Sequence, residues 1–152
     1  MAEPGNDRLI FEMGLYKAAF PRDLLYSEIH FWFQPRENST RVGLSSYAMR
    51  LLGDLFRLEW KVYVGESVQP EQCLGEVEST KASAEVYTPM SGKIIDINSA
   101  AVDDPSQVSL DPYEHWLLEF EGRPEKFLSS QQYMEFLAAD WEVTIKLLKG
   151  QA

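Results

Sequence analysis

The sequence predicts a mainly β domain, a small barrel or sandwich with two helices. Glycine and proline recur at short intervals, which is typical of strands joined by tight turns. The segments between them are rich in β-branched and aromatic residues, which favour strands. With 152 residues, of which 45% are hydrophobic and 25% charged, the chain has the size and composition of one folded domain. The turn-forming residues are Gly43, Gly53, Gly65, Pro70, Gly75, Pro89, Gly92, Pro105, Pro112 and Gly122.

Four strand features are predicted. Residues 29–33 and 59–64 carry the aromatic and β-branched side chains of strands. Residues 76–78 and 86–88 alternate apolar with polar side chains around a run of small residues, which predicts a hairpin with Lys81 near its tip. Residues 64–68 and 90–95 resemble two copies of one glycine-centred bend, which suggests a quasi-twofold arrangement.

Two helices are predicted. Residues 45–52 begin with serines that can cap a helix and stop at Gly53, a typical C-terminal residue. Residues 129–137 also begin with serines. Tyr133, Phe136 and Leu137 fall on one face of this second helix, so we expect that face to pack on the sheet.

The charge is strongly acidic and uneven. Lys and Arg number 14 and Asp and Glu 24, for a net charge of −10. Residues 61–122 contain 3 basic and 12 acidic side chains, which is nearly the whole excess. Because such a surface repels phosphate groups, we expect neither nucleic acid nor an anionic membrane as a partner.

The compartment is predicted from what the chain lacks. No run approaches the roughly 18 apolar residues of a membrane span, and residues 1–11 lack a secretory signal. The single cysteine, Cys73, cannot form an internal disulfide and is expected to be a small core residue in a reducing compartment. We therefore expect a cytoplasmic protein, or a mitochondrial-matrix protein whose presequence has been removed.

Lys81 is the residue with the clearest chemical potential. It stands alone among acidic side chains between Lys61 and Lys93, and its neighbours Thr80 and Ala82 are small. An isolated surface lysine is ordinarily a solvated residue. Accessibility, small neighbours and an acidic surround that attracts basic partners are, however, the properties of a covalent modification site.

The segment Glu78-Ser79-Thr80-Lys81-Ala82 resembles the lipoyl-attachment hairpin of the glycine cleavage system H protein. Further matches follow in the family's order from residue 20 to 138. They are residues 26–32, Val42-Gly43-Leu44, Tyr47-Ala48, Leu51-Leu52-Gly53-Asp54, Glu59, Val64-Gly65, residues 74–77 and 86–92, Asp111-Pro112-Tyr113, Trp116-Leu117 and the helix over 133–137.

The resemblance implies a lipoyl/biotinyl-type barrel-sandwich hybrid over residues 20–138, with a short flanking helix and a C-terminal helix. Residues 1–19 and 139–152 would be extensions. It also implies a non-catalytic, monomeric carrier with lipoic acid on Lys81, which accepts an aminomethyl group in glycine catabolism. The implied partners are glycine decarboxylase, aminomethyltransferase, dihydrolipoamide dehydrogenase and the enzyme that attaches lipoate.

The resemblance further implies a groove for the arm. Glu85 and Tyr87 match positions that line it in the family, and we add Glu78 and His30 as candidates. From the residues alone, His30 is expected to be a packed strand residue, and His115 is expected to be structural. No set of His, Cys, Asp and Glu has metal-ligand spacing.

Several departures keep alternatives open. The family's His-Glu-Trp is His30-Phe31-Trp32 here, and residues 60–63 replace a Leu-Pro run, so the same fold serving another lipoate-dependent system, such as sulfur metabolism, is a second hypothesis. A biotin carrier is disfavoured because methionines do not flank Lys81. An enzyme that uses Lys81, His30 or Cys73 directly is disfavoured because small, polar and acidic neighbours keep the Lys81 amine charged. An unmodified scaffold is the remaining hypothesis.

Overall fold

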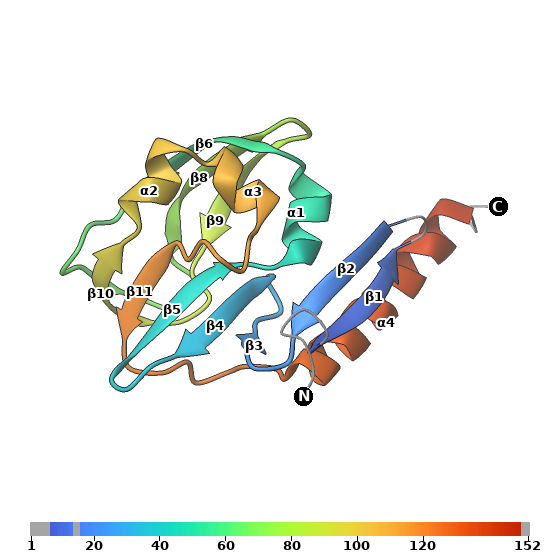
Figure 1. Cartoon of the computed structure of the whole chain (residues 1–152), viewed down its shortest axis with the longest axis horizontal. Coiled ribbons are helices and arrows are strands. Elements are labelled where there is room, and N and C mark those ends of the chain that lie inside the picture. The colour runs from blue at the N-terminus through green and yellow to red at the C-terminus, as the bar shows by residue number, and fades with distance from the viewer. Residues whose placement is uncertain (1–6, 14–15, 150–152) are drawn as a thin grey trace.

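The computed structural model describes residues 7–13 and 16–149 and confirms a mainly β domain (Figure 1). The largest sheet has six strands, and neighbouring strands are antiparallel. In order across the sheet they are β3 (Leu25–Tyr26), β4 (Phe31–Pro35), β5 (Ser39–Leu44), β11 (Leu118–Glu121), β10 (Gly92–Ile97) and β7 (Ser67–Val68).

The described residues also form two smaller antiparallel sheets and four helices. The three-stranded sheet is β6 (Leu55–Trp60), β8 (Cys73–Ser79) and β9 (Ser83–Tyr87), and the two-stranded sheet is β1 (Arg8–Met13) and β2 (Tyr16–Pro21). The helices are α1 (Ser46–Leu52), α2 (Ser99–Asp103), α3 (Ser106–Leu110) and α4 (Ser130–Lys149). The short helices α2 and α3 were not predicted. None of the helices described is long and apolar enough to cross a membrane.

The main core draws apolar side chains from both larger sheets. Phe33, Val42 and Phe120 come from the six-stranded sheet, and Leu55 and Leu74 come from β6 and β8, all of them 0 to 1% exposed. Burial of this many large side chains is the main favourable term for folding. The three-stranded sheet, which carries the Lys81 hairpin, is therefore packed against the six-stranded sheet.

Two predicted strands are displaced from their expected positions. The strand expected over residues 29–33 begins only at Phe31, because His30 has a left-handed backbone (φ 73°) in a turn closed by the Ser27 N–H to Phe31 O bond. The strand expected over residues 59–64 begins earlier, at Leu55, and ends at Trp60. Composition alone does not separate these positions from strands, because Ile29, Tyr63 and Val64 are strand-favouring residues that lie exposed outside the strands.

The two glycine-centred segments lie side by side. β7 pairs with β10 in antiparallel register, with Gly92 opposite Val68 and Lys93 opposite Ser67. Gly65 has a left-handed backbone (φ 98°), and its N–H donates to the Ile94 carbonyl at 2.7 Å. The two similar sequences thus meet as neighbouring strand ends, as a local twofold arrangement would place them.

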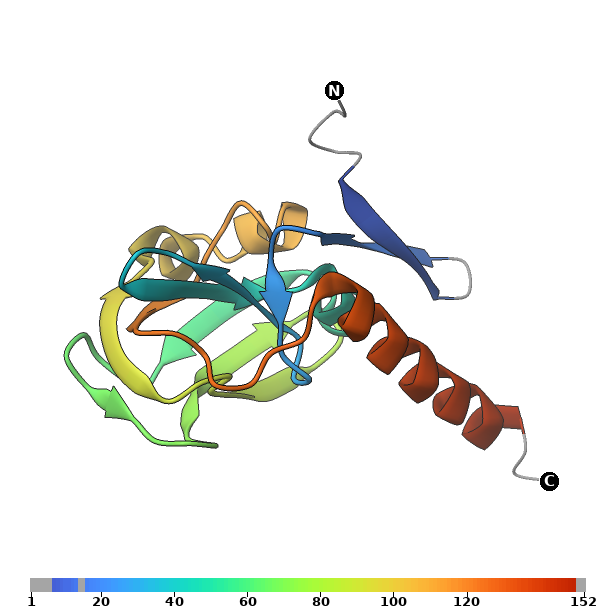
Figure 2. The ribbon, with the colours of Figure 1, turned by 90° about the horizontal axis from the view of Figure 1, so that it is seen from below.

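Both predicted helices are confirmed, and the second is longer than expected. The Ser45 side chain accepts the Ala48 N–H, and α1 ends at Gly53 (φ 77°). α4 continues to Lys149, through the predicted C-terminal extension (Figure 2). Its buried Tyr133 and Leu137 face the β1–β2 hairpin and β3 rather than the middle of the sheet, and Phe136 is half-buried.

The predicted N-terminal extension contains a packed hairpin. Phe11 of β1 and Phe20 of β2 are buried, and both belong to an aromatic cluster with Tyr47 and Tyr133. The Ala19 carbonyl accepts bonds from the hydroxyls of Ser46 at 2.8 Å and Tyr113 at 2.6 Å. The hairpin is therefore joined both to α4 and to the start of α1.

We expect Gly75→Ala to lower the free energy of unfolding by about 3 kcal/mol, as overpacking does. A Cβ at Gly75 would lie 2.1 Å from the Glu59 carbonyl oxygen and 3.0 Å from the Trp60 Cα, so two backbones would have to separate. Gly122→Ala is the control, because its Cβ would meet nothing within 4 Å and only its left-handed φ of 88° is costly. We expect a loss of about 1 kcal/mol there. Equal losses in urea unfolding would contradict the steric argument.

Candidate functional site

The predicted hairpin is confirmed, with Lys81 exposed at its tip between β8 and β9. The Ser79 hydroxyl closes the tip: it accepts the N–H groups of Lys81 at 3.3 Å and Ala82 at 3.1 Å and donates to the Ala82 carbonyl at 2.9 Å. The Ser79 N–H donates to the same carbonyl at 2.8 Å. This one serine thereby gives the three-residue turn a defined shape.

The tip is also bound from outside, at the corner between α1 and β6. The Thr80 N–H donates to the Asp54 carbonyl at 3.0 Å, and the Asp54 N–H donates to the Thr80 hydroxyl at 3.2 Å. Gly53 permits this approach, because a Cβ there would lie 2.6 Å from the Thr80 hydroxyl oxygen and 3.2 Å from the Lys81 Cγ. The exposed lysine therefore stands on a docked tip rather than on a free loop.

The Lys81 amine contacts the end of α1. Its Nζ donates to the Arg50 carbonyl at 2.8 Å. Carbonyls in the last turn of a helix lack partners within the helix and attract positive charge. The C-terminal end of α1 thus binds the Lys81 amine.

A groove of about 230 Å³ lies between β9, α1 and the turn before β4. We call it the first groove. Its wall is mostly apolar, and it brings together His30, Glu85 and Tyr87, three of the four predicted groove residues. It is lined by Ile29, His30, Phe31, Leu44, Ala48, Leu51, Leu52, Val77, Ala84, Glu85, Val86 and Tyr87.

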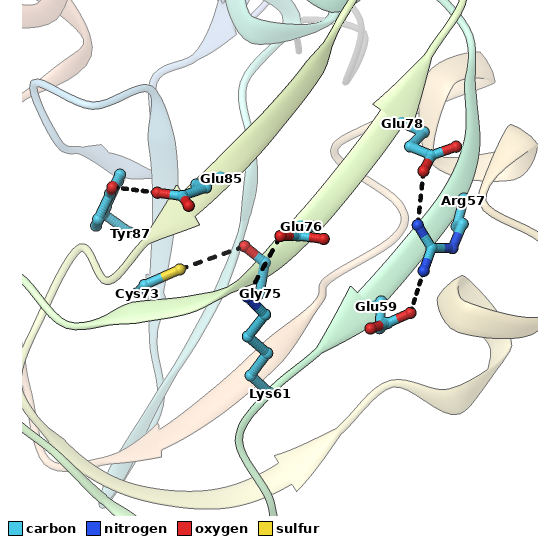
Figure 3. Close-up of polar contacts among 9 residues, drawn as sticks. All are labelled: Arg57, Glu59, Lys61, Cys73, Gly75, Glu76, Glu78, Glu85 and Tyr87. Atoms are coloured by element: carbon cyan, nitrogen blue, oxygen red, sulfur yellow. Dashed lines mark hydrogen bonds and ion pairs between the residues drawn. The ribbon is translucent and has the colours of Figure 1, made fainter.

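Glu78 does not lie in this groove. Its carboxylate accepts the Arg57 guanidinium at 2.6 Å, and the same guanidinium pairs with Glu59 (Figure 3). The hydrogen bond to Glu78, together with the charges of both carboxylates, raises the pKa of Arg57. Lys61 pairs with Glu76 at 3.3 Å on the same sheet. Glu76 and Glu78, two of the acidic side chains expected around Lys81, are thus paired with cations.

Glu85 and Tyr87 form a second polar pair, at the rim of the first groove. Both project from β9, and the Tyr87 hydroxyl donates to the Glu85 carboxylate (Figure 3). This bond raises the pKa of Tyr87. Residues two apart on a strand share a face, which is how β9 brings the pair together.

His30 is half-buried and bonded to the C-terminal helix. Its Nδ1 lies 2.9 Å from the Tyr133 hydroxyl, which lies 2.9 Å from the Ser45 hydroxyl at the start of α1. Burial lowers the pKa of His30, against the weaker attraction of Asp140. A packed histidine was expected at this position, whereas its link to Tyr133 was not.

We expect the pH dependence of stability to report His30. Burial lowers the pKa of His30 in the folded protein, so the folded ring binds a proton less readily than the ring of the unfolded chain, whose ordinary pKa is about 6.5. This contribution is therefore complete above that pH, and stability falls as the pH is lowered below it. His30→Asn, which tolerates the left-handed backbone, should reduce the loss measured by urea unfolding between about pH 7 and 5. An unchanged slope would contradict the assignment.

The other candidate residues stay apart from the site. Cys73 is half-buried rather than in the core, and its Sγ donates to the Gly75 carbonyl at 3.5 Å. His115 is half-buried beside Trp116. Within the described ranges, no three His, Cys, Asp or Glu side chains are grouped to hold a metal ion.

The fold and the exposed lysine define a small carrier domain of the lipoyl/biotinyl barrel-sandwich type. The family model described as "Glycine cleavage H-protein" matches residues 24–140. A curated "Glycine cleavage system H protein" of Thermoanaerobacter sp. (strain X514) is 36% identical over 118 residues, covering 75% of this chain and 93% of that protein. A "Probable glycine cleavage system H protein" of Thermococcus kodakarensis is 37% identical over 134 residues, covering 84% and 98%.

A solved structure agrees with these matches. The crystal structure of a glycine cleavage system H protein from Mycobacterium marinum has a TM-score of 0.71 and 35% identity, and covers 78% of this chain and 99% of that one. This chain belongs to the glycine cleavage H-protein family. The β1–β2 hairpin and the last turns of α4 lie outside the residues that the family model matches.

Two features of the site were missed from sequence. Thr80 and Asp54 both lie in segments that carry the family resemblance, but their mutual bonds join positions 26 residues apart. The Tyr133 to His30 bond spans 103 residues. One indirect signal was present in the sequence. Thr80 carries a hydroxyl, which an exposed tip residue needs only if it makes a polar contact.

Proposed function

We propose that this protein is the lipoyl carrier of a glycine cleavage system, with lipoic acid in amide linkage to Lys81. The observation that carries the proposal is the exposed Lys81 on a docked tip within Glu78–Ala82, next to an apolar groove. A groove of about 230 Å³ with a mostly apolar wall fits a hydrocarbon arm that ends in a dithiolane. The family membership supports the same role.

The chain supplies presentation rather than catalysis. The attached dithiolane would accept an aminomethyl group from glycine decarboxylase, pass it to aminomethyltransferase and be reoxidised by dihydrolipoamide dehydrogenase. Thr80, Asp54 and Ser79 hold the tip so that Lys81 meets each of these partners, and the attaching enzyme, in one geometry.

We assign the first groove to the loaded arm. Ile29, Leu51 and Val86 offer apolar contact to the methylenes of the arm. Glu85 offers a carboxylate to a protonated amine, and Tyr87 orients that carboxylate. His30 remains neutral beside it and adds no opposing charge. Glu78 is left out of this assignment, because it pairs with Arg57.

A lipoyl carrier for another system, such as sulfur metabolism, is the second candidate. One observation favours it: Phe31, which replaces the acidic residue usual in the family, is 2% exposed and belongs to the core. The first groove therefore gains no carboxylate from that position. Exchange of labelled carbon dioxide with the carboxyl group of glycine separates the two candidates, because only the first requires glycine decarboxylase.

We expect the protein isolated from its native host to carry one lipoyl group on Lys81. Intact-protein mass spectrometry followed by peptide mapping should locate the added mass on that residue. The same measurement on Lys81→Ala, expressed in the same host, should show no added mass. An unmodified native protein under lipoate-replete conditions, or a lipoyl group elsewhere, would contradict the proposal.

A further inference from the structure

A second groove lies on the other side of α1. It has a volume of about 380 Å³ and opens between β2, α1 and α3. Ala48, Leu51 and Leu52 of α1 line the first groove, whereas Ser46, Met49, Arg50 and Gly53 line the second. Residues three and four apart share a helix face, so the two sets lie on different faces of α1. The proposed function assigns nothing to this second groove.

The Lys81 side chain is directed into the second groove and not into the first. Lys81 lines the second groove and is absent from the wall of the first. Its Cγ and Cδ pass Gly53, at 3.2 and 3.4 Å from the place of a Cβ there, before Nζ reaches the Arg50 carbonyl. Because Thr80 and Asp54 hold the tip, the backbone of Lys81 stays at the edge of the second groove.

We propose that the second groove is the resting site of the unloaded lipoyl arm. This inference rests on the lipoylation of Lys81 proposed above. A charged lysine has three N–H donors, and its amide keeps one, which is enough to retain the bond to the Arg50 carbonyl at 2.8 Å. The arm would then continue from that bond along the groove rather than across α1.

The wall of the second groove suits a hydrocarbon arm. Leu110 at the end of α3 is 85% exposed, and the buried Met49 and Pro112 also line the groove. An arm in this groove would cover the leucine, and burial of apolar surface is favourable. β2 forms the opposite wall through Lys17 and Ala19, so this site uses the hairpin that lies outside the family match.

The first groove suits the loaded arm better than the second groove does. Lys17 and Arg50 line the second groove together with the single carboxylate of Asp54. An oxidised dithiolane is neutral, so this mixture of charges neither attracts nor repels it. The first groove, in contrast, offers the Glu85 carboxylate to a protonated amine.

Methyl NMR of the lipoylated, oxidised full-length protein tests the inference. Mass spectrometry first verifies that the arm is attached, so a failure of lipoylation is distinguished from a failure of this proposal. We expect cross-peaks from the arm methylenes to the methyl groups of Met49 and Leu110. Cross-peaks to Ala48 and Leu51 instead, or none to either groove, would overturn the proposal.

The rate at which dithiothreitol reduces the dithiolane gives a second readout. When the arm rests in the groove, dithiothreitol reacts only with the fraction of molecules whose arm is exposed. If four-fifths of the arms rest there, Leu110→Glu should increase the rate about fivefold. Val64→Glu is the matched control, because Val64 is 55% exposed and lines neither groove. Its rate should equal that of the unsubstituted protein. Equal rates for all three proteins would overturn the proposal.

Discussion

Lys81→Arg should abolish the exchange of labelled carbon dioxide with the carboxyl group of glycine in a reconstituted glycine cleavage system. Arginine keeps the positive charge and a long side chain, but its guanidinium is not acylated under conditions that acylate an amine. The unsubstituted protein, lipoylated and verified by mass, should support exchange. The variant should fall to the rate measured without carrier, because no arm remains to react.

The fold is not expected to change in Lys81→Arg. The side chain is exposed and its Nζ donates one bond to the Arg50 carbonyl, so the free energy of unfolding should change by less than about 0.5 kcal/mol. Lys93→Arg is the control, because Lys93 is an exposed residue of β10 that lines neither groove. Full exchange by Lys81→Arg, or an equal loss by Lys93→Arg, would show that the arm is not on Lys81.

Tyr133→Ala should lower the free energy of unfolding by about 4 kcal/mol, as large-to-small changes of buried aromatic residues do. The ring is 0% exposed, stacks on Tyr26 with centroids 4.8 Å apart and meets the edge of Phe20 at 5.0 Å. Its removal would leave a cavity where α4 meets β3 and the β1–β2 hairpin. Urea unfolding of the full chain measures the loss.

Tyr133→Phe separates the hydroxyl from the ring. It should cost about 1 to 2 kcal/mol, because the buried Ser45 hydroxyl and the His30 Nδ1 each lose a partner at 2.9 Å. Tyr87→Phe is the control, because Tyr87 is 46% exposed and its hydroxyl contacts only the exposed Glu85. That change should be within about 0.5 kcal/mol. Equal losses for the two phenylalanine variants would contradict a structural role for the Tyr133 hydroxyl.

The β1–β2 hairpin and the end of α4 lie at the edges of the predicted carrier domain. We predicted the carrier domain over residues 20–138, and the family model matches residues 24–140. The N-terminal hairpin and α4 pack on each other and on Tyr26 and Tyr47. We propose that both segments act as a brace behind α1, the helix that separates the two grooves.

The sequence by itself determined the features that depend on a few neighbouring residues. Ser45 and Gly53 delimit α1 because a helix cap needs only the residues of its own turn. The small residues around Lys81 predict the hairpin for the same reason. The similarity of this segment to a family motif predicts Lys81 as the attachment residue. The full length of α4 was missed, although neither Gly nor Pro occurs between residues 130 and 149.

Tertiary structure decided whatever depends on side chains from distant segments. His30 adopts a left-handed backbone in a turn that ends on Phe31, so an apolar run that favours a strand becomes a turn and then a strand. Glu78 is removed from the first groove because β6 places Arg57 beside it. Asp54 directs the tip towards the second groove through bonds whose partners meet only after β6 and β8 have paired. Local propensity contains no information about such partners, because burial and strand register select them only in the folded chain.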